Sequence, residues 1–210
     1  MVSSMLIRAE ERREILENVH KLMYTYGLNK VIRYEQVRNE VHQTQSVAEH
    51  VTNMLFCAYH FRDIEDPEHR LNFEEIIKMI LMHDMGEIET GDIVTNKKTK
   101  ADTELEYVAI KSVKVKSPNF VKREVESIFE RFEEPQTPEE RFAKAIDKFE
   151  GTIFWFTDDG IKMIKSVSSN DVIQRYFERL ESTLDKLGFI NILKYIIVMK
   201  DDMISRGLLA

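Results

Sequence analysis

The stretch NFEEIIKMILMHD, residues 72–84, indicates the fold class and also raises the functional question. It starts with Asn and has Glu three residues later, which is the pattern of a capping box at a helix N-terminus. The apolar run at residues 76–82 has the composition of a buried helix, yet it ends on His83 and Asp84 side by side. Because charged groups seldom enter a core without a partner, this pair predicts a polar site at the end of a core helix.

The helical pattern continues along most of the chain. Apolar residues recur at helical spacing, strand patterns are scarce, and the chain has only four prolines and seven glycines. Ser46 and Glu49 form a second capping-box pattern, and Thr137-Pro138 opens another helix with proline at its first position. Further helices are expected near residues 9–26, 102–115, 118–132, 169–187 and 189–205. We expect an all-α, single-domain helical bundle.

Two segments interrupt this pattern. Residues 28–45 lack a clean period, so we expect an irregular connection there. The sequence Asp158-Asp159-Gly160 is typical of a turn.

Composition narrows the class of protein. A length of 210 residues fits one domain, 43% hydrophobic residues can supply a core, and a net charge of -7 argues against nucleic-acid polymers and membrane surfaces as partners. The single cysteine, Cys57, excludes an internal disulfide and favours a reducing, cytoplasmic location. The N-terminus lacks a signal-peptide pattern, and no run approaches the ~20 apolar residues of a membrane-spanning helix.

Three predicted helices each offer an inward polar position. His50 lies on the apolar face of its helix, and Asp147 flanks the apolar face of another. Together with His83 and Asp84 they supply two imidazoles and two carboxylates, a suitable ligand set for one divalent ion such as Mn, Co, Fe, Ni, Zn or Mg. Such an ion would neutralise both aspartates.

Each of these side chains taken alone has a plainer structural explanation. An inward histidine is more often a hydrogen-bonded core residue than a ligand, and a flanking aspartate is more often a cap or ion-pair partner. The order His…His-Asp…Asp on separate helices is what favours a metal site. No such partner pattern surrounds the remaining histidines, which are His20, His42, His60 and His69.

Three segments in combination resemble the HD-domain metal-dependent phosphohydrolases, in particular their 5′-deoxynucleotidase branch. They are SVAEH, LMHDMGEIETGDIVT and TPEERFAKAIDKFEG, and the upstream RYEQVRN is similar to that branch's Arg-Trp…Arg-Asn segment. The likeness spans about residues 33–151. We expect one domain over residues 1–210, with the motifs in a core of about 33–156 and C-terminal helices at 165–207 forming a packing or dimer surface.

The resemblance implies a role for each matching residue near the metal. Glu87 corresponds to the acidic residue that handles the proton of the attacking water or of the leaving oxygen. It follows His83 by four residues, so the two share a face if the helix continues that far. Asp84 belongs both to the catalytic pair with Glu87 and to the metal ligands. The four positions that match the ligands are His50, His83, Asp84 and Asp147.

The resemblance also implies substrate contacts and a homodimer. Arg33 corresponds to the arginine that binds the phosphate, and Asp92 to the residue that meets a sugar hydroxyl. Tyr34 departs from the branch, because bacterial members have Trp beside the sugar at this position. The preference for deoxyribose over ribose therefore stays open.

We expect a divalent-metal-dependent phosphomonoester hydrolase that acts on deoxyribonucleoside 5′-monophosphates. One alternative is hydrolysis of another nucleotide class, such as a ribonucleotide, a cyclic nucleotide, a polyphosphorylated nucleotide or an analogue. A second is a non-catalytic nucleotide- or metal-binding regulatory protein, and a third is a helical interaction domain without metal. No phosphate-binding glycine loop, HExxH motif or cysteine-based zinc pattern is present to favour another enzyme class.

Overall fold

The computed structural model describes residues 9–34, 44–93, 99–167 and 170–208. Within them the chain is helical apart from connections and an isolated bridge between Ile32 and Ser46, so the predicted all-α class is confirmed. The helices in chain order are α1 (Ala9–Thr25), η1 (Tyr26–Asn29), α2 (Val47–Glu65), α3 (Phe73–Met82), α4 (Glu87–Thr90), α5 (Lys100–Lys116), α6 (Asn119–Glu133), α7 (Pro138–Ile153), η3 (Phe154–Phe156), α8 (Asp158–Val167), α9 (Asn170–Leu187) and α10 (Ile190–Ser205).

Local hydrogen bonds explain where several helices begin. Complete capping boxes open α2, α5 and α7, and those of α2 and α7 lie at the predicted starts. The start of α3 is only partly as predicted. The Asn72 side chain accepts a hydrogen bond from the Glu75 backbone N–H, but the Glu75 carboxylate binds Arg131 of α6 at 2.7 Å. Because the Glu75 carboxylate pairs with Arg131 in another helix, it does not accept the second hydrogen bond of a capping box.

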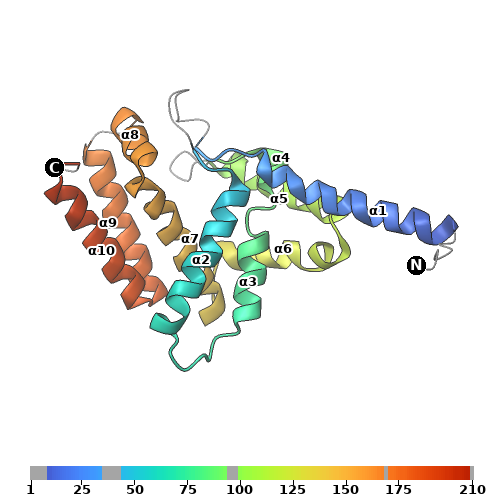
Figure 1. Ribbon diagram of the computed structural model, residues 1–210, viewed down its shortest axis with the longest axis horizontal. Coiled ribbons are helices and arrows are strands. Elements are labelled where there is room, and N and C mark those ends of the chain that lie inside the picture. Colours follow the sequence, from blue (N-terminus) through green and yellow to red (C-terminus); the bar gives the residue numbers. More distant parts are fainter. Residues whose placement is uncertain (1–8, 35–43, 94–98, 168–169, 209–210) are drawn as a thin grey trace, which may run out of the picture.

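Helix α7 lies at the centre of the bundle. It packs against α2, α3, α6, α9 and α10, and Figure 1 shows it between the C-terminal helices and the α2–α3 pair. One face of the predicted core run of α3 is buried, with Ile76, Met79 and Ile80 fully inaccessible, whereas Leu81 is 42% exposed. Burying each such side chain contributes about 1.5–3 kcal/mol, so this packing fixes the end of α3 against α7.

The C-terminal helices lie on one side of the bundle, and α1 projects from the other (Figure 1). Helix α9 packs on α7, and α10 packs on α2, α7 and α9. The turn predicted at residues 158–160 is wrong, because these residues begin α8. The Thr157 hydroxyl accepts a hydrogen bond from the Gly160 N–H at 3.0 Å, so the polar residues initiate a helix instead. A Cβ at Gly160 would lie 2.0 Å from the Phe154 carbonyl oxygen, so glycine permits the close approach of α8 to η3.

In the described part of the chain, no helix is both long enough and apolar enough to cross a bilayer.

Candidate metal centre

The predicted metal ligands converge from three helices. His50 comes from the first turn of α2, His83 and Asp84 directly follow α3, and Asp147 comes from α7. The Asp84 Oδ2 atom lies 3.0 Å from His83 Nε2 and 3.7 Å from His50 Nε2. One ligand atom each from His50, His83 and Asp84 lies within 4.8 Å of the other two. Asp147 is not part of that tight group, but its Oδ1 atom lies 3.4 Å from His50 Nε2.

Both imidazoles leave the same nitrogen without a hydrogen-bond partner. The His83 Nδ1 atom lies 3.0 Å from the Ile80 carbonyl oxygen, to which it donates, and His50 Nδ1 contacts Glu150. Within the described residues, His50 Nε2 and His83 Nε2 are buried and have no hydrogen-bond partner. Leaving a buried polar atom unpaired costs about 1–3 kcal/mol. Two such nitrogens beside carboxylates therefore fit a divalent cation, which accepts lone pairs from imidazole nitrogens and carboxylate oxygens.

The two aspartates stay ionised although they are enclosed. Burial opposes ionisation of Asp84, but His83 and His50 outweigh it and lower the pKa of Asp84 to about 2. Burial also opposes ionisation of Asp147, yet Lys148 and His50 hold its pKa well below the usual range. The Lys148 ammonium lies 3.0 Å from Asp147 Oδ2. Two ionised carboxylates therefore lie beside the unpartnered imidazole nitrogens, and one of them, Asp147, is also paired with Lys148.

Glu87 reaches the site by a different route from the one predicted. Helix α3 ends at Met82, so His83 and Glu87 do not share a continuous helix. Glu87 instead begins α4 after a turn in which its N–H donates to the Asp84 carbonyl oxygen at 3.0 Å. Its Oε2 atom is buried and, among the described residues, has no hydrogen-bond partner. Burial raises the pKa of Glu87 well above its usual range, and the charges of Asp84 and Asp92 raise it further.

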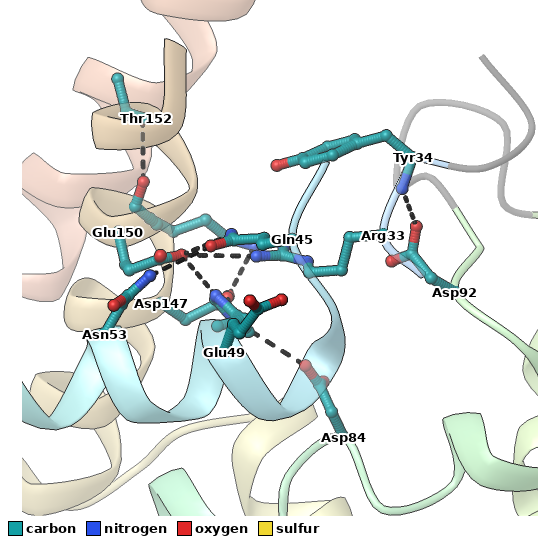
Figure 2. A network of polar contacts seen from close by, with 12 residues as sticks. Arg33, Tyr34, Gln45, Glu49, Asn53, Asp84, Asp92, Asp147, Glu150 and Thr152 are labelled. Atoms are coloured by element: carbon teal, nitrogen blue, oxygen red, sulfur yellow. Dashed lines mark hydrogen bonds and ion pairs between the residues drawn. The ribbon is translucent and has the colours of Figure 1, made fainter. Parts of the chain in front are cut away.

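Glu150 connects two of the predicted site residues and was not among the predictions. Its Oε2 atom accepts hydrogen bonds from Arg33 Nη1 and Gln45 Nε2, both at 3.3 Å (Figure 2). The same oxygen contacts His50 Nδ1. The residue is only 2% exposed. One signal was available in the sequence, because Glu150 follows Asp147 by three residues and so lies on the same face of α7.

The predicted substrate residues Arg33, Tyr34 and Asp92 lie near one another, to the right of Glu150 in Figure 2. Tyr34 has φ of +62°, and its backbone N–H donates to Asp92 Oδ2 at 2.7 Å. A left-handed conformation is costly for a tyrosine, so Asp92 helps to hold an unfavourable backbone. The Tyr34 ring stacks on Phe154 with centroids 5.6 Å apart, and the Arg33 guanidinium carbon lies 5.2 Å from the Tyr34 ring centroid. Arg38, Asn39 and the Lys97-Lys98 pair lie outside the described residues.

Comparisons with known proteins find similar sequences and folds. A protein-family model described as an HD domain matches residues 27–187. The proteins named 5′-deoxynucleotidase HDDC2 from Mus musculus and Homo sapiens are 30% and 28% identical over 125 residues. These matches cover 59% of this chain and 60% and 59% of the two relatives, so the chain spans about three fifths of their length.

Solved structures share the fold over most of the chain. A protein from Magnetospirillum magnetotacticum MS-1, described as a predicted metal-dependent phosphohydrolase, superposes with a TM-score of 0.76 at 19% identity. This match covers 98% of this chain and 100% of that one. A protein from Pyrococcus horikoshii OT3 gives a TM-score of 0.64 at 18% identity, over 85% of this chain and 97% of the other.

Proposed function

Because the chain belongs to the HD-domain family, we propose that it is a divalent-metal-dependent phosphohydrolase acting on deoxyribonucleoside 5′-monophosphates. The observation that carries the proposal is the pair of buried Nε2 atoms on His50 and His83, which have no hydrogen-bond partner among the described residues and lie beside Asp84. The relatives named 5′-deoxynucleotidase support the substrate class.

The proposed ligands provide two neutral nitrogens and two carboxylates. They are His50, His83, Asp84 and Asp147. A divalent ion held there would act as a Lewis acid that polarises a phosphoryl oxygen and lowers the pKa of a water molecule. Mn, Co, Fe, Ni, Zn and Mg all fit this ligand set, since all accept imidazole or carboxylate ligands in proteins.

Arg33 is the proposed phosphate clamp. Its Nη1 atom already donates to Glu150, whereas its buried Nε atom has no hydrogen-bond partner within the described residues. A phosphate oxygen would satisfy this donor, and a guanidinium keeps its charge at any physiological pH. The clamp thus orients the phosphate and offsets its charge among the surrounding carboxylates.

Glu87 is the proposed general acid. Burial raises the pKa of Glu87 well above its usual range, which favours the protonated carboxyl group, and the unpartnered Oε2 atom would present that proton to the leaving 5′ oxygen. Proton transfer of this kind contributes about 10²–10⁴-fold in rate. Asp84, in contrast, is an ionised ligand in this proposal. Glu87 and Asp84 can serve different roles because their environments move their pKa values in opposite directions.

Tyr34 and Asp92 are the proposed sugar contacts. The stacked ring of Tyr34 forms a flat surface next to Arg33, where a nucleoside attached to the clamped phosphate would lie. Tyr34 is polar where bacterial members of the branch have Trp, so discrimination against a 2′-hydroxyl depends on how closely this ring contacts the sugar.

Phosphate release from a matched panel of deoxyribo- and ribonucleoside 5′-monophosphates, with Mn²⁺ or Co²⁺ added to metal-stripped protein, tests the proposal. We expect release that requires the metal and is faster for the deoxyribonucleotides. Equal rates for both sugars would refute the deoxyribose preference. Metal binding without phosphate release from any nucleotide would instead favour a regulatory binding protein.

A homodimer and a cytoplasmic location, both expected from the sequence, stay predictions. Exposed apolar side chains on α1 and α10, including Leu22 and Val198, offer surfaces for association. Sedimentation equilibrium of the full chain measures the oligomeric state directly.

A further inference from the structure

We infer that Glu150 is a positioning residue that holds the metal-binding histidine and the phosphate-binding arginine in one fixed arrangement. The roles of His50 and Arg33 in this inference rest on the proposed function. Glu150 itself is assigned neither to the metal nor to the substrate. Its carboxylate acts through the two side chains that it contacts.

The first support is the way in which a single oxygen is shared. Glu150 Oε2 contacts His50 Nδ1 and accepts from Arg33 Nη1 and Gln45 Nε2, each at 3.3 Å. A carboxylate that is 2% exposed needs such partners, because burying it unpaired would be strongly unfavourable. Glu150 therefore has little freedom to move, and the same restraint passes to the groups bound to it.

The second support is the orientation that this contact gives to His50. A proton on Nδ1 directed at Glu150 leaves Nε2 on the opposite side of the ring, which is the nitrogen near Asp84 and Asp147. Carboxylates in this position fix the tautomer and the plane of a ligating histidine and raise its basicity as a ligand. The bond thus prepares His50 for a cation.

The third support is the frame around the carboxylate. Gln45 Oε1 accepts from Asn53 Nδ2 at 3.2 Å, which orients the amide so that its Nε2 faces Glu150. The backbone of Gln45 also accepts from the Arg33 N–H at 2.9 Å. The segment that carries Arg33 is therefore tied to the start of α2, and Glu150 ties both to α7.

Calorimetric titration of Mn²⁺ into the metal-stripped full chain tests the inference. We expect Glu150→Ala to raise the Kd for Mn²⁺ about 10–100-fold, which is the usual effect of losing such a partner. Glu150→Gln keeps an oxygen that can accept from His50, so it should recover most of this loss. Glu140→Gln is the matched control, because Glu140 lies on the same helix and is 3% exposed but contacts no proposed ligand.

A readout without metal separates positioning from general support of the fold. Nitrogen-15 NMR of the metal-free chain should show His50 protonated at Nδ1 in the wild type and in Glu140→Gln, with that preference lost in Glu150→Ala. Wild-type Mn²⁺ affinity in folded Glu150→Ala, or equal weakening in Glu140→Gln, would overturn the inference. Mn²⁺ binding by the wild type without phosphate release would refute the proposed hydrolase function. The Kd values of the Glu150 variants for Mn²⁺ would still test the positioning role.

Discussion

Two buried charged clusters lie near opposite ends of α7, and they differ in how their polar atoms are paired. Near the start of the helix, Glu140 accepts from Arg131 Nε at 2.6 Å and from the backbone N–H groups of Gln136 and Thr137 at 2.6 and 2.9 Å. Near the other end, His50 Nε2 and His83 Nε2 have no hydrogen-bond partner among the described residues.

The comparison shows that buried charge alone does not mark a functional site. The Glu140 cluster is complete within the protein and joins α3, α6 and α7 through Arg131, which also binds Glu75. The histidine cluster has two buried imidazole nitrogens without a hydrogen-bond partner among the described residues, and a bound cation would satisfy both. We therefore expect changes in the first cluster to affect folding, and changes in the second to affect ligand binding and catalysis.

The largest effect on function should follow Asp84→Asn. A neutral amide cannot offset a divalent charge, and Asp84 Oδ2 lies close to both unpartnered imidazole nitrogens, 3.0 Å from His83 Nε2 and 3.7 Å from His50 Nε2. We expect Mn²⁺ binding to be lost in calorimetry and phosphate release to fall to background. Retained binding and turnover would remove Asp84 from the ligand set.

Glu87→Ala should separate catalysis from metal binding. The proposed acid is lost while all four proposed ligands stay, so kcat should fall about 10²–10⁴-fold with an unchanged Kd for Mn²⁺. Steady-state kinetics and calorimetry on the same preparation measure both quantities. Full activity would show that another group supplies the proton.

Glu140→Ala should affect stability and leave the site intact. Removing this carboxylate leaves Arg131 Nε and two backbone N–H groups without their acceptor, at a cost of about 1–3 kcal/mol in the free energy of unfolding. Urea denaturation gives this value, and Mn²⁺ affinity of the folded variant serves as the control. A loss of metal affinity without a loss of stability would contradict the proposed division between the clusters.

The smallest effect concerns acid stability. Burial opposes ionisation of Glu140, but the backbone N–H of Thr137 and the guanidinium of Arg131 outweigh it and lower its pKa from 4.5 to about 2. The unfolded state therefore binds the Glu140 proton more readily than the folded state does. The contribution of ionised Glu140 to the free energy of unfolding is present above pH 4.5 and is lost as pH falls toward 2. Thermal unfolding of metal-free protein between pH 5 and pH 3 should show a shallower decline for Glu140→Gln than for the wild type. An equal fall in the unfolding temperature of the wild type and of Glu140→Gln would show that other groups cause the pH dependence.

Features with short-range causes could be predicted from the sequence. The starts of α2 and α7 follow from side chains that bind backbone groups three residues away, and the burial of α3 follows from its apolar run. The order of His50, His83, Asp84 and Asp147 on or beside apolar helix faces predicted that these side chains meet, and the structure brings them together. Their role as metal ligands stays a prediction.

Features with long-range causes could not be predicted in the same way. Glu150 lies 100 residues from His50 in the chain, and Asp92 lies 58 residues from Tyr34. Glu75 fitted a capping box in the sequence but pairs with Arg131, 56 residues away. Such partners depend on which helices pack together, and the local pattern contains no information about that choice.

The sequence by itself determined the helical class, most helix bounds and the residue types available to hold a cation, because these depend on periodicity and on contacts within one turn. Only the tertiary structure decided which buried atoms are paired and which remain open. Packing α2, α3 and α7 together brought the imidazoles beside the aspartates and put Glu150 behind His50. Whether a buried charge serves folding or ligand binding is settled by that pairing, since each polar atom removed from water needs a partner.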